Sequence, residues 1–121
     1  MKIDFEQWLG AQFADTGAFT IFIVLVHIAG EQVSAVKSTY AQMIGDDMKW
    51  SEMCALLDGA RTPWDAVAFF VGLGAGGPLI DSVARAKLKD IEGSVTTDPL
   101  ALNRGMFFDR QGRHMQIDES P

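Results

Sequence analysis

Thr20–Ile28, with the sequence TIFIVLVHI, decides the fold of this chain. Six of its nine residues have β-branched side chains. The apolar run shows neither a helical nor an alternating period, so the choice between helix and strand rests on length and composition. Both favour a strand that is buried on its two faces, as in a parallel sheet.

A second apolar run, Ala66–Val71, leads into the most informative motif of the chain. The motif is Gly72-Leu73-Gly74-Ala75-Gly76-Gly77-Pro78, with four glycines in six positions. The apolar residues after it recur at helical spacing: Ile80, Ala84, Leu88 and Ile91. The order is therefore a strand, a glycine loop and a helix that ends at Gly93.

The segment between the two apolar runs decides how the two strands are related. After Gly30, apolar side chains recur at helical spacing, and Gly45 provides a stop: Val33, Val36, Tyr40 and Ile44. We therefore expect a helix over residues 31–44. Two strand–helix units in succession predict a parallel pair of strands with helical cover.

The remaining segments complete a small domain. We expect an N-terminal helix from Asp4 with one apolar face, a short helix capped by Ser51, a short strand over residues 95–97, and a C-terminal hairpin whose turn is residues 109–112. The apolar side chains of the two helices are Phe5, Trp8, Leu9 and Phe13 in the first, and Met53, Cys54 and Leu57 in the second. The predicted fold is a single α/β domain over residues 1–121, with a short, mostly parallel sheet, helical cover and a C-terminal β-hairpin.

A ligand site is the sharpest functional hypothesis. Three glycines of the loop fit the G-x-G-x-x-G pattern, in which backbone N–H groups and a helix N-terminus bind a phosphate. His27 ends the first predicted strand, and in a parallel sheet it would share an edge with the glycine loop. The candidate ligand-binding residues are Gly72, Gly74, Gly76, Gly77, His27 and Asp98, an acid 21 residues past Gly77.

The alternative interpretation of the loop is a tight strand-to-helix turn without a ligand. Only 23 residues follow Asp98, which is too few for the rest of a dinucleotide-binding fold. The loop contains no Lys or Arg, and Asp81 puts a negative charge where a phosphate would bind. The sequence therefore indicates no particular cofactor.

Catalytic and metal-binding groups are sparse. The chain has two histidines and one cysteine. We expect Cys54 in the core and Asp46-Asp47 in a solvated turn, so the sequence predicts neither a catalytic constellation nor a metal site.

Charge and composition narrow the partners and the compartment. Sixteen acidic and ten basic residues give a net charge of −6, which argues against nucleic acid as a partner. A lone cysteine fits a reducing compartment, and residues 1–4 lack the basic region and apolar run of a signal peptide. We therefore expect a cytoplasmic protein.

Two uncharged stretches of 15 residues, Thr16–Gly30 and Ala66–Ile80, require a membrane alternative to be considered. A spanning helix needs about 20 apolar residues, so the stretches are short for that role. The membrane is thus an unfavoured but open partner.

Three functions follow from these observations. The first is a non-catalytic interaction or accessory protein that acts as a homo-oligomer, with a protein partner as a further option, because apolar helix faces are present and catalytic groups are few. The second is a small-ligand, nucleotide or phosphate-binding domain that uses the Gly72–Gly77 loop. The third is a small membrane protein with two short apolar spans.

Overall fold

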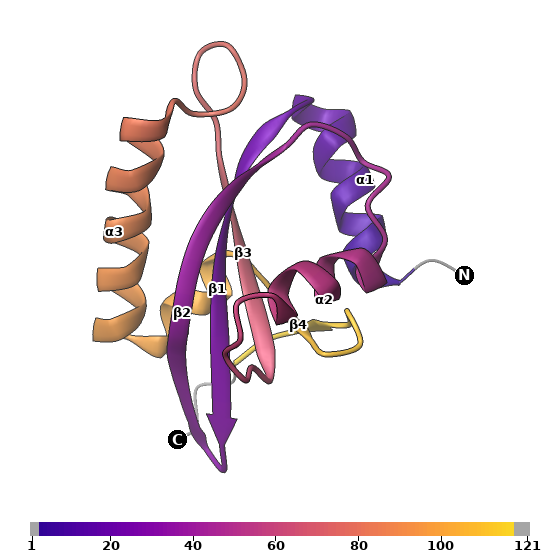
Figure 1. The fold of residues 1–121 in the computed structure, drawn as a ribbon. Coiled ribbons are helices and arrows are strands. Elements are labelled where there is room, and N and C mark those ends of the chain that lie inside the picture. The colour runs from indigo at the N-terminus through magenta and orange to yellow at the C-terminus, as the bar shows by residue number, and fades with distance from the viewer. Residues whose placement is uncertain (1–2, 118–121) are drawn as a thin grey trace.

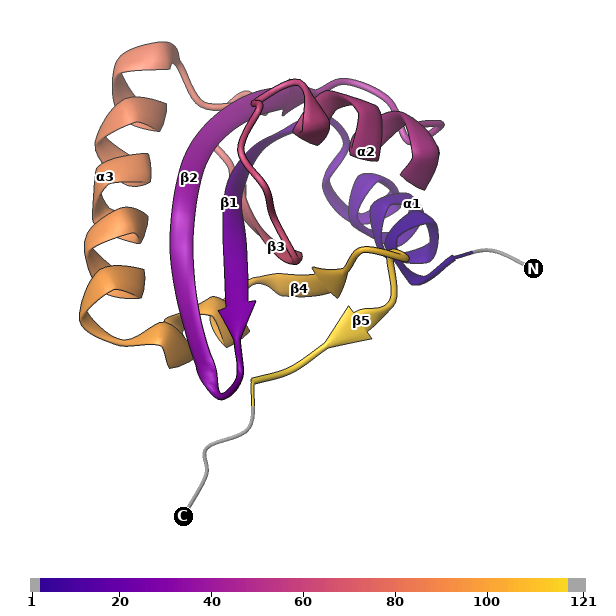
Figure 2. The ribbon, with the colours of Figure 1, turned by 60° about the horizontal axis from the view of Figure 1, so that its bottom comes forward.

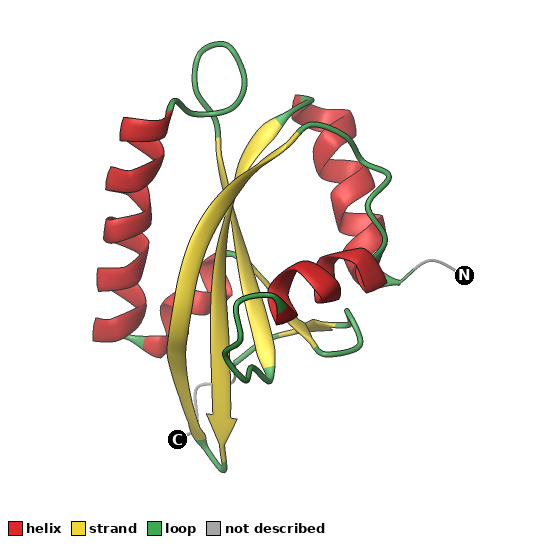
Figure 3. Cartoon of the chain, in the orientation of Figure 1, coloured by secondary structure: helices red, strands yellow, loops and turns green. Residues whose placement is uncertain are grey.

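The computed structural model describes residues 3–117, which form helices packed on both faces of one five-stranded sheet (Figure 1). In chain order the elements are α1 (Asp4–Thr16), β1 (Phe19–Ala29), β2 (Gln32–Met43), α2 (Trp50–Asp58), β3 (Ala66–Gly72), α3 (Asp81–Thr97), the 3₁₀ helix η1 (Pro99–Arg104), β4 (Met106–Asp109) and β5 (His114–Met115). Figure 3 shows the same chain coloured by secondary structure.

The strand predicted over residues 20–28 is confirmed, but the mostly parallel sheet is wrong. The strand order is β2-β1-β3-β4-β5, and every neighbouring pair is antiparallel. β1 and β2 form a hairpin in which Ala29 pairs with Gln32 across a two-residue turn, Gly30-Glu31. A turn this short joins only antiparallel strands, so it fixes the direction of β2.

The helix predicted over residues 31–44 is also wrong, because this segment is β2. Glycine at the first position of a two-residue loop is typical of a hairpin turn, and Gly30 has φ 61°. This turn signal and the β-branched residues of the segment outweigh the helical spacing of its apolar side chains. With β2 as a strand, the chain returns through α2 and starts β3 beside Val26, so β3 runs opposite to β1.

Burial of β1 on both faces organises the molecule. Eight consecutive residues, Phe19–Val26, are buried. α1 and α2 cover one face of the sheet, and α3 with η1 covers the other (Figure 1). The sheet is therefore the middle layer of three, and β1 lies between β2 and β3.

The core under α1 and α2 is mostly aromatic. Phe5 of α1 lies against Trp50, Phe69 and Phe108, with ring centroids 5.1, 5.5 and 5.8 Å away. Trp8 stacks on Phe69 with the rings 6° from parallel. The predicted N-terminal helix and the short helix around Met53 are confirmed, with α2 starting at Trp50.

The second core lies between the sheet and α3. The C-terminal hairpin is confirmed as β4 and β5 (Figure 2), and its alternation puts Phe108 in the first core and Phe107 in the second. Val95 of α3 and Leu102 of η1 pack in the same cluster as Phe107. The strand predicted over residues 95–97 is wrong, because α3 continues through Gly93 to Thr97.

No helix among residues 3–117 is long and apolar enough to cross a membrane. The two uncharged stretches that prompted the membrane alternative contribute strands β1 and β3 to the sheet.

Two glycines offer opposite tests of this packing. A Cβ at Gly105 would collide with the carbonyl oxygen of Phe69, whereas one at Gly93 would meet nothing within 4 Å. We expect Gly105→Ala to lower the free energy of unfolding by about 1–3 kcal/mol through overpacking. Gly93→Ala should raise it by about 0.5–1 kcal/mol, because Ala loses less backbone entropy in a helix. Urea denaturation of both variants measures the difference, and equal effects would contradict the placement of Gly105 beside β3.

Candidate interaction surface at the free edge of the sheet

The structure does not bring the predicted ligand-binding residues together. Gly72 pairs with Thr20 at one end of β1, whereas His27 lies at the other end, beyond the pair of Val26 with Ala66. Because β1 and β3 are antiparallel, their carboxyl-terminal ends lie at opposite ends of the sheet. The crevice that a parallel pair would share therefore does not form. Asp98 follows the last residue of α3, roughly 25 Å along the helix from its start, which is where the glycine loop leads.

The glycine loop closes on itself. The N–H of Gly74 donates to the carbonyl of Gly77 over 2.6 Å, and the reciprocal bond measures 3.4 Å. Gly77 has φ 116°, a conformation that favours glycine. Gly72 is buried against Phe22, and Gly76 is exposed. Two of the amides that a phosphate would need are thus already bonded within the loop, and ligand binding there stays a prediction.

The start of α3 is occupied by protein groups. The helix begins at Asp81, four residues after the loop, and the Asp81 carboxylate accepts hydrogen bonds from Tyr40 and Arg85. Asp98 accepts a bond from the N–H of Leu100 over 3.0 Å and so caps η1. Both acids therefore have structural partners.

His27 is paired with Asp65, which the sequence did not single out. His27 Nδ1 lies 2.8 Å from the Asp65 carboxylate, and both side chains are about half exposed. The N–H of Ile28 donates to the same carboxylate over 2.7 Å, and this bond is the main cause that lowers the pKa of Asp65. Among residues 3–117 no hydrogen bond links His27 to a hydroxyl or thiol, so the pair joins β1 to the start of β3 without forming a nucleophile–base unit.

Cys54 is not activated. Burial raises the pKa of its thiol, and the nearby Arg110 only partly opposes that effect. A raised pKa keeps the thiol protonated and unreactive near neutral pH. In the described part of the chain, no group of three or more His, Cys, Asp or Glu could hold a metal ion.

The most distinctive surface is instead the free edge of β2, which sequence analysis missed. β2 is 12 residues long, and in the described part of the chain a strand pairs with it on one side only. The hydrogen bonds of Asp65 with Val26 and Ile28 show that the backbone groups of these two β1 residues face β3. Because backbone direction alternates along a strand, those of Thr20, Phe22 and Val24 face β3 as well.

The β2 residues opposite these last three must therefore turn their backbone groups outward. They are Gln42, Tyr40 and Ser38, which pair with Thr20, Phe22 and Val24 respectively. Each presents an N–H and a carbonyl to the open edge, whereas the residues between them bond to β1. The free edge is thus an ordered row of donors and acceptors.

Three side-chain contacts hold this edge in place. Ser38 donates to Glu92, Tyr40 donates to Asp81, and Gln42 donates to the carbonyl of Leu79 over 3.2 Å. Thr20, which is fully buried, donates to Gln42 and accepts from the N–H of Leu79. From Ser38 to Gln42, every second residue of the edge is therefore bonded to α3 or to the segment that precedes it.

The other face of the edge borders a groove of about 360 Å³ between β2 and the end of α2. Its lining is largely apolar: Ile23, Leu25, Lys37, Ser38, Thr39, Tyr40, Ala41, Leu56, Leu57, Gly59 and Ala60. Leu56 is 53% exposed beside it. Lys37 is the one charged residue of β2, and its ammonium group donates to the carbonyl of Ala60 over 3.2 Å.

A polar cluster ties α2 to the C-terminal hairpin. Asp58 accepts hydrogen bonds from the Trp64 indole over 3.0 Å and from the Arg110 guanidinium over 3.2 Å. The guanidinium also lies 4.0 Å from the centre of the Trp64 ring. These bonds, the indole first, lower the pKa of Asp58 below its ordinary value.

Asp58 therefore predicts a pH dependence of stability. Since its pKa is lower in the folded state, its contribution is present above the unfolded-state pKa and is lost as pH falls through the folded-state pKa. As pH falls from the unfolded-state pKa of Asp58 through its folded-state pKa, the free energy of unfolding should decrease less for Asp58→Asn than for the wild type. Urea denaturation at several pH values measures both decreases. Asp90→Asn, on the exposed side of α3, is the control and should follow the wild type. Parallel curves for Asp58→Asn and the wild type would contradict the assignment.

Comparison of the chain with known protein families, with curated proteins and with solved structures found no match.

Proposed function

We propose that this chain is a non-catalytic interaction protein that acts as a homodimer, joined through the free edges of two β2 strands. The observation that carries the proposal is the edge itself, which is 12 residues long, has outward backbone groups at alternate positions and carries one charge. Strands with a long, nearly uncharged free edge readily pair with another strand.

A second copy is the occupant that fits this edge. Two identical strands can pair antiparallel about a two-fold axis, so that each supplies the same donors and acceptors to the other. Such pairing closes both edges and ends the assembly at two copies. The opposite side of the sheet ends in β5, which has two residues and offers little to pair with.

Apolar surface beside the edge supports the same assembly. A two-fold axis normal to the sheet would place the two grooves between β2 and α2 on the same face, next to each other. Leu56, which is 53% exposed, would lose solvent contact there, and Val36, which is 41% exposed, lies on the α3 side of the same edge. Val36 is the extra residue of a bulge in β2, since Leu25 pairs with Lys37 and Val26 pairs with Ala35.

Net charge gives the dimer a salt dependence. Each chain carries a net charge of −6, so two copies repel one another at long range. Since β2 has Lys37 and no acid, the repulsion comes from the rest of the surface and is screened by salt. We therefore expect dimerisation to strengthen as ionic strength rises to physiological values.

The other functions remain proposals with weaker support. The exposed tip of the Gly72–Gly77 loop supports a ligand site, but its separation from His27 and Asp98 leaves the loop without additional ligand groups. A cytoplasmic location and a further protein partner are likewise proposals that rest on the cysteine content and on the exposed apolar side chains.

Substitution of Thr39 tests the dimer. Thr39 is exposed at the centre of the edge, between Lys37 and Ala41, and Thr39→Lys would bring extra positive charges of two copies together. We expect dimerisation to weaken by roughly tenfold or more, because like charges in an interface are costly. Thr97→Lys, the same change at the exposed end of α3, should leave it unchanged. Sedimentation equilibrium measures both constants.

A wild-type protein that stays monomeric across the micromolar range at physiological salt would overturn the proposal. Equal weakening by Thr39→Lys and Thr97→Lys would place the interface elsewhere.

A further inference from the structure

A second open edge lies along the last residues of β3, on the side of that strand away from β1. β4 pairs with β3 only from Ala66 to Phe69, so no strand within residues 3–117 pairs with Phe70–Gly72 on that side. A pocket of about 340 Å³ occupies the gap, between α1, α3 and η1. Pockets of this size are at the lower end of those that hold small ligands.

Val71 directs its backbone into this gap. Val71 pairs with Ile21. The backbone N–H and carbonyl groups of Thr20 and Phe22, on either side of Ile21, point to β3, so those of Ile21 point to β2. The N–H and carbonyl of Val71 therefore point away from β1, toward the space that a longer β4 would fill. Within residues 3–117, no backbone–backbone hydrogen bond of a turn or loop involves the N–H or the carbonyl of Val71.

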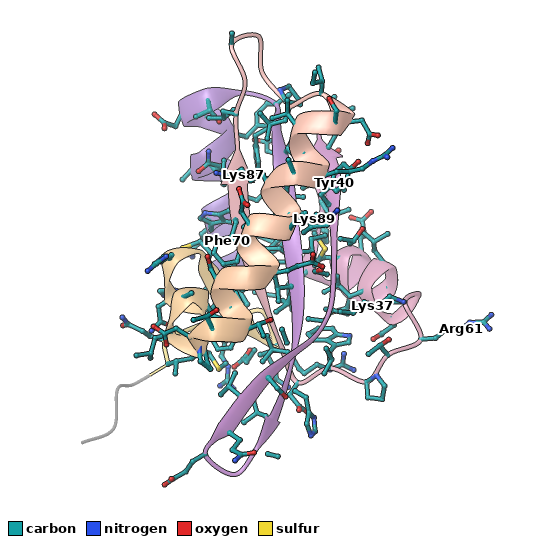
Figure 4. The ribbon with its side chains drawn as sticks, turned by 90° about the vertical axis from the view of Figure 1, so that its left-hand side faces the viewer. Lys37, Tyr40, Arg61, Phe70, Lys87 and Lys89 are labelled. Atoms are coloured by element: carbon teal, nitrogen blue, oxygen red, sulfur yellow. The ribbon has the colours of Figure 1, made fainter. Side chains whose placement is uncertain are left out.

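Two cations border the same pocket. Lys87 comes from α3 and Arg104 from the end of η1. Neither makes an ion pair or a side-chain hydrogen bond within the part of the chain that the structure describes. Figure 4 shows Lys87 and Phe70 on the same side of α3, which is the side on which η1 lies. An acidic chain thus places two uncompensated positive charges at one pocket.

The remaining wall is aromatic and polar. Trp8 and Gln12 of α1 line the pocket from the opposite face of the sheet, and Phe70 and Met106 supply apolar surface. The pocket therefore offers a backbone donor and acceptor, two cations, an indole and a side-chain amide.

We propose that this pocket binds the carboxyl-terminal end of an extended peptide from a partner protein. The peptide backbone would pair with Val71 as a short additional strand, and its terminal carboxylate would bind Lys87 and Arg104. An apolar side chain of the peptide would lie against Trp8. The site is separate from the β2 edge, so its failure and the failure of the dimer can be observed independently.

The test uses a pool of acetylated tripeptides of Val, Thr, Leu and Ser, prepared once with a free carboxyl end and once as the amide. Binding is measured from amide chemical shifts of the full chain at millimolar peptide. We expect the free-acid pool to shift Val71 and its neighbours in β3, and the amide pool to bind roughly tenfold more weakly, because it lacks the charge that the cations recognise.

Variants assign the carboxylate contact. Lys87→Met and Arg104→Met should each weaken the free-acid pool by about tenfold and leave the amide pool unchanged. Lys89→Met, which removes an exposed lysine from the same helix, is the matched control and should bind as the wild type does. Butyrate serves as a carboxylate without a peptide backbone.

Each contrary result has a distinct meaning. No shift at Val71 with the free-acid pool, or equal binding of acid and amide, would overturn the proposal. Butyrate that binds as tightly as the peptide pool would overturn the peptide and leave a site for small carboxylates.

Discussion

Burial of β1 on both faces is the constraint from which the rest of the structure follows. An unbroken buried run from Phe19 to Val26 requires a packed layer on each side and a strand on each flank. The hairpin turn at Gly30 supplies β2 on one flank, and the return through α2 supplies β3 on the other. Both partners of β1 are thus fixed by local chain geometry, and within residues 3–117 no strand pairs with the outer side of β2.

A free edge of this length is normally a liability, and the chain limits it in several ways. A bulge at Val36 interrupts the regular register, and Lys37 places a charge near its centre. The bonds of Ser38 and Tyr40 to α3 hold the strand against that helix. An edge that is held in place loses little further entropy on pairing, so the same contacts favour the proposed pairing with a second copy.

Local patterns in the sequence predicted most individual elements but not their arrangement. β-branching identified β1, alternation identified the C-terminal hairpin, and helical spacing identified α1. The same spacing in residues 31–44 led to a helix, although Gly30-Glu31 already carried a hairpin signal. With a helix in place of β2, the two apolar runs were predicted to be parallel neighbours. That arrangement placed His27 beside Gly72.

The candidate surfaces could not be predicted for a related reason. Whether the backbone groups of Ser38 and Tyr40 are left unpaired depends on whether another strand lies beside β2. The local sequence of β2 does not indicate this. Lys87 and Arg104 line the same pocket because η1 turns the chain back from the end of α3. Contacts of this kind come from the tertiary arrangement and have no fixed spacing in the sequence.

Hydrogen exchange of the β2 amides tests the central claim, that this strand is an edge which a second copy closes. Lys37, Thr39 and Ala41 bond to β1 and should be protected at every protein concentration. Ser38, Tyr40 and Gln42 face outward and should exchange quickly in dilute protein and more slowly as concentration rises through the dimerisation range. Protection that is the same at all concentrations, or that shows no alternation along β2, would contradict the account.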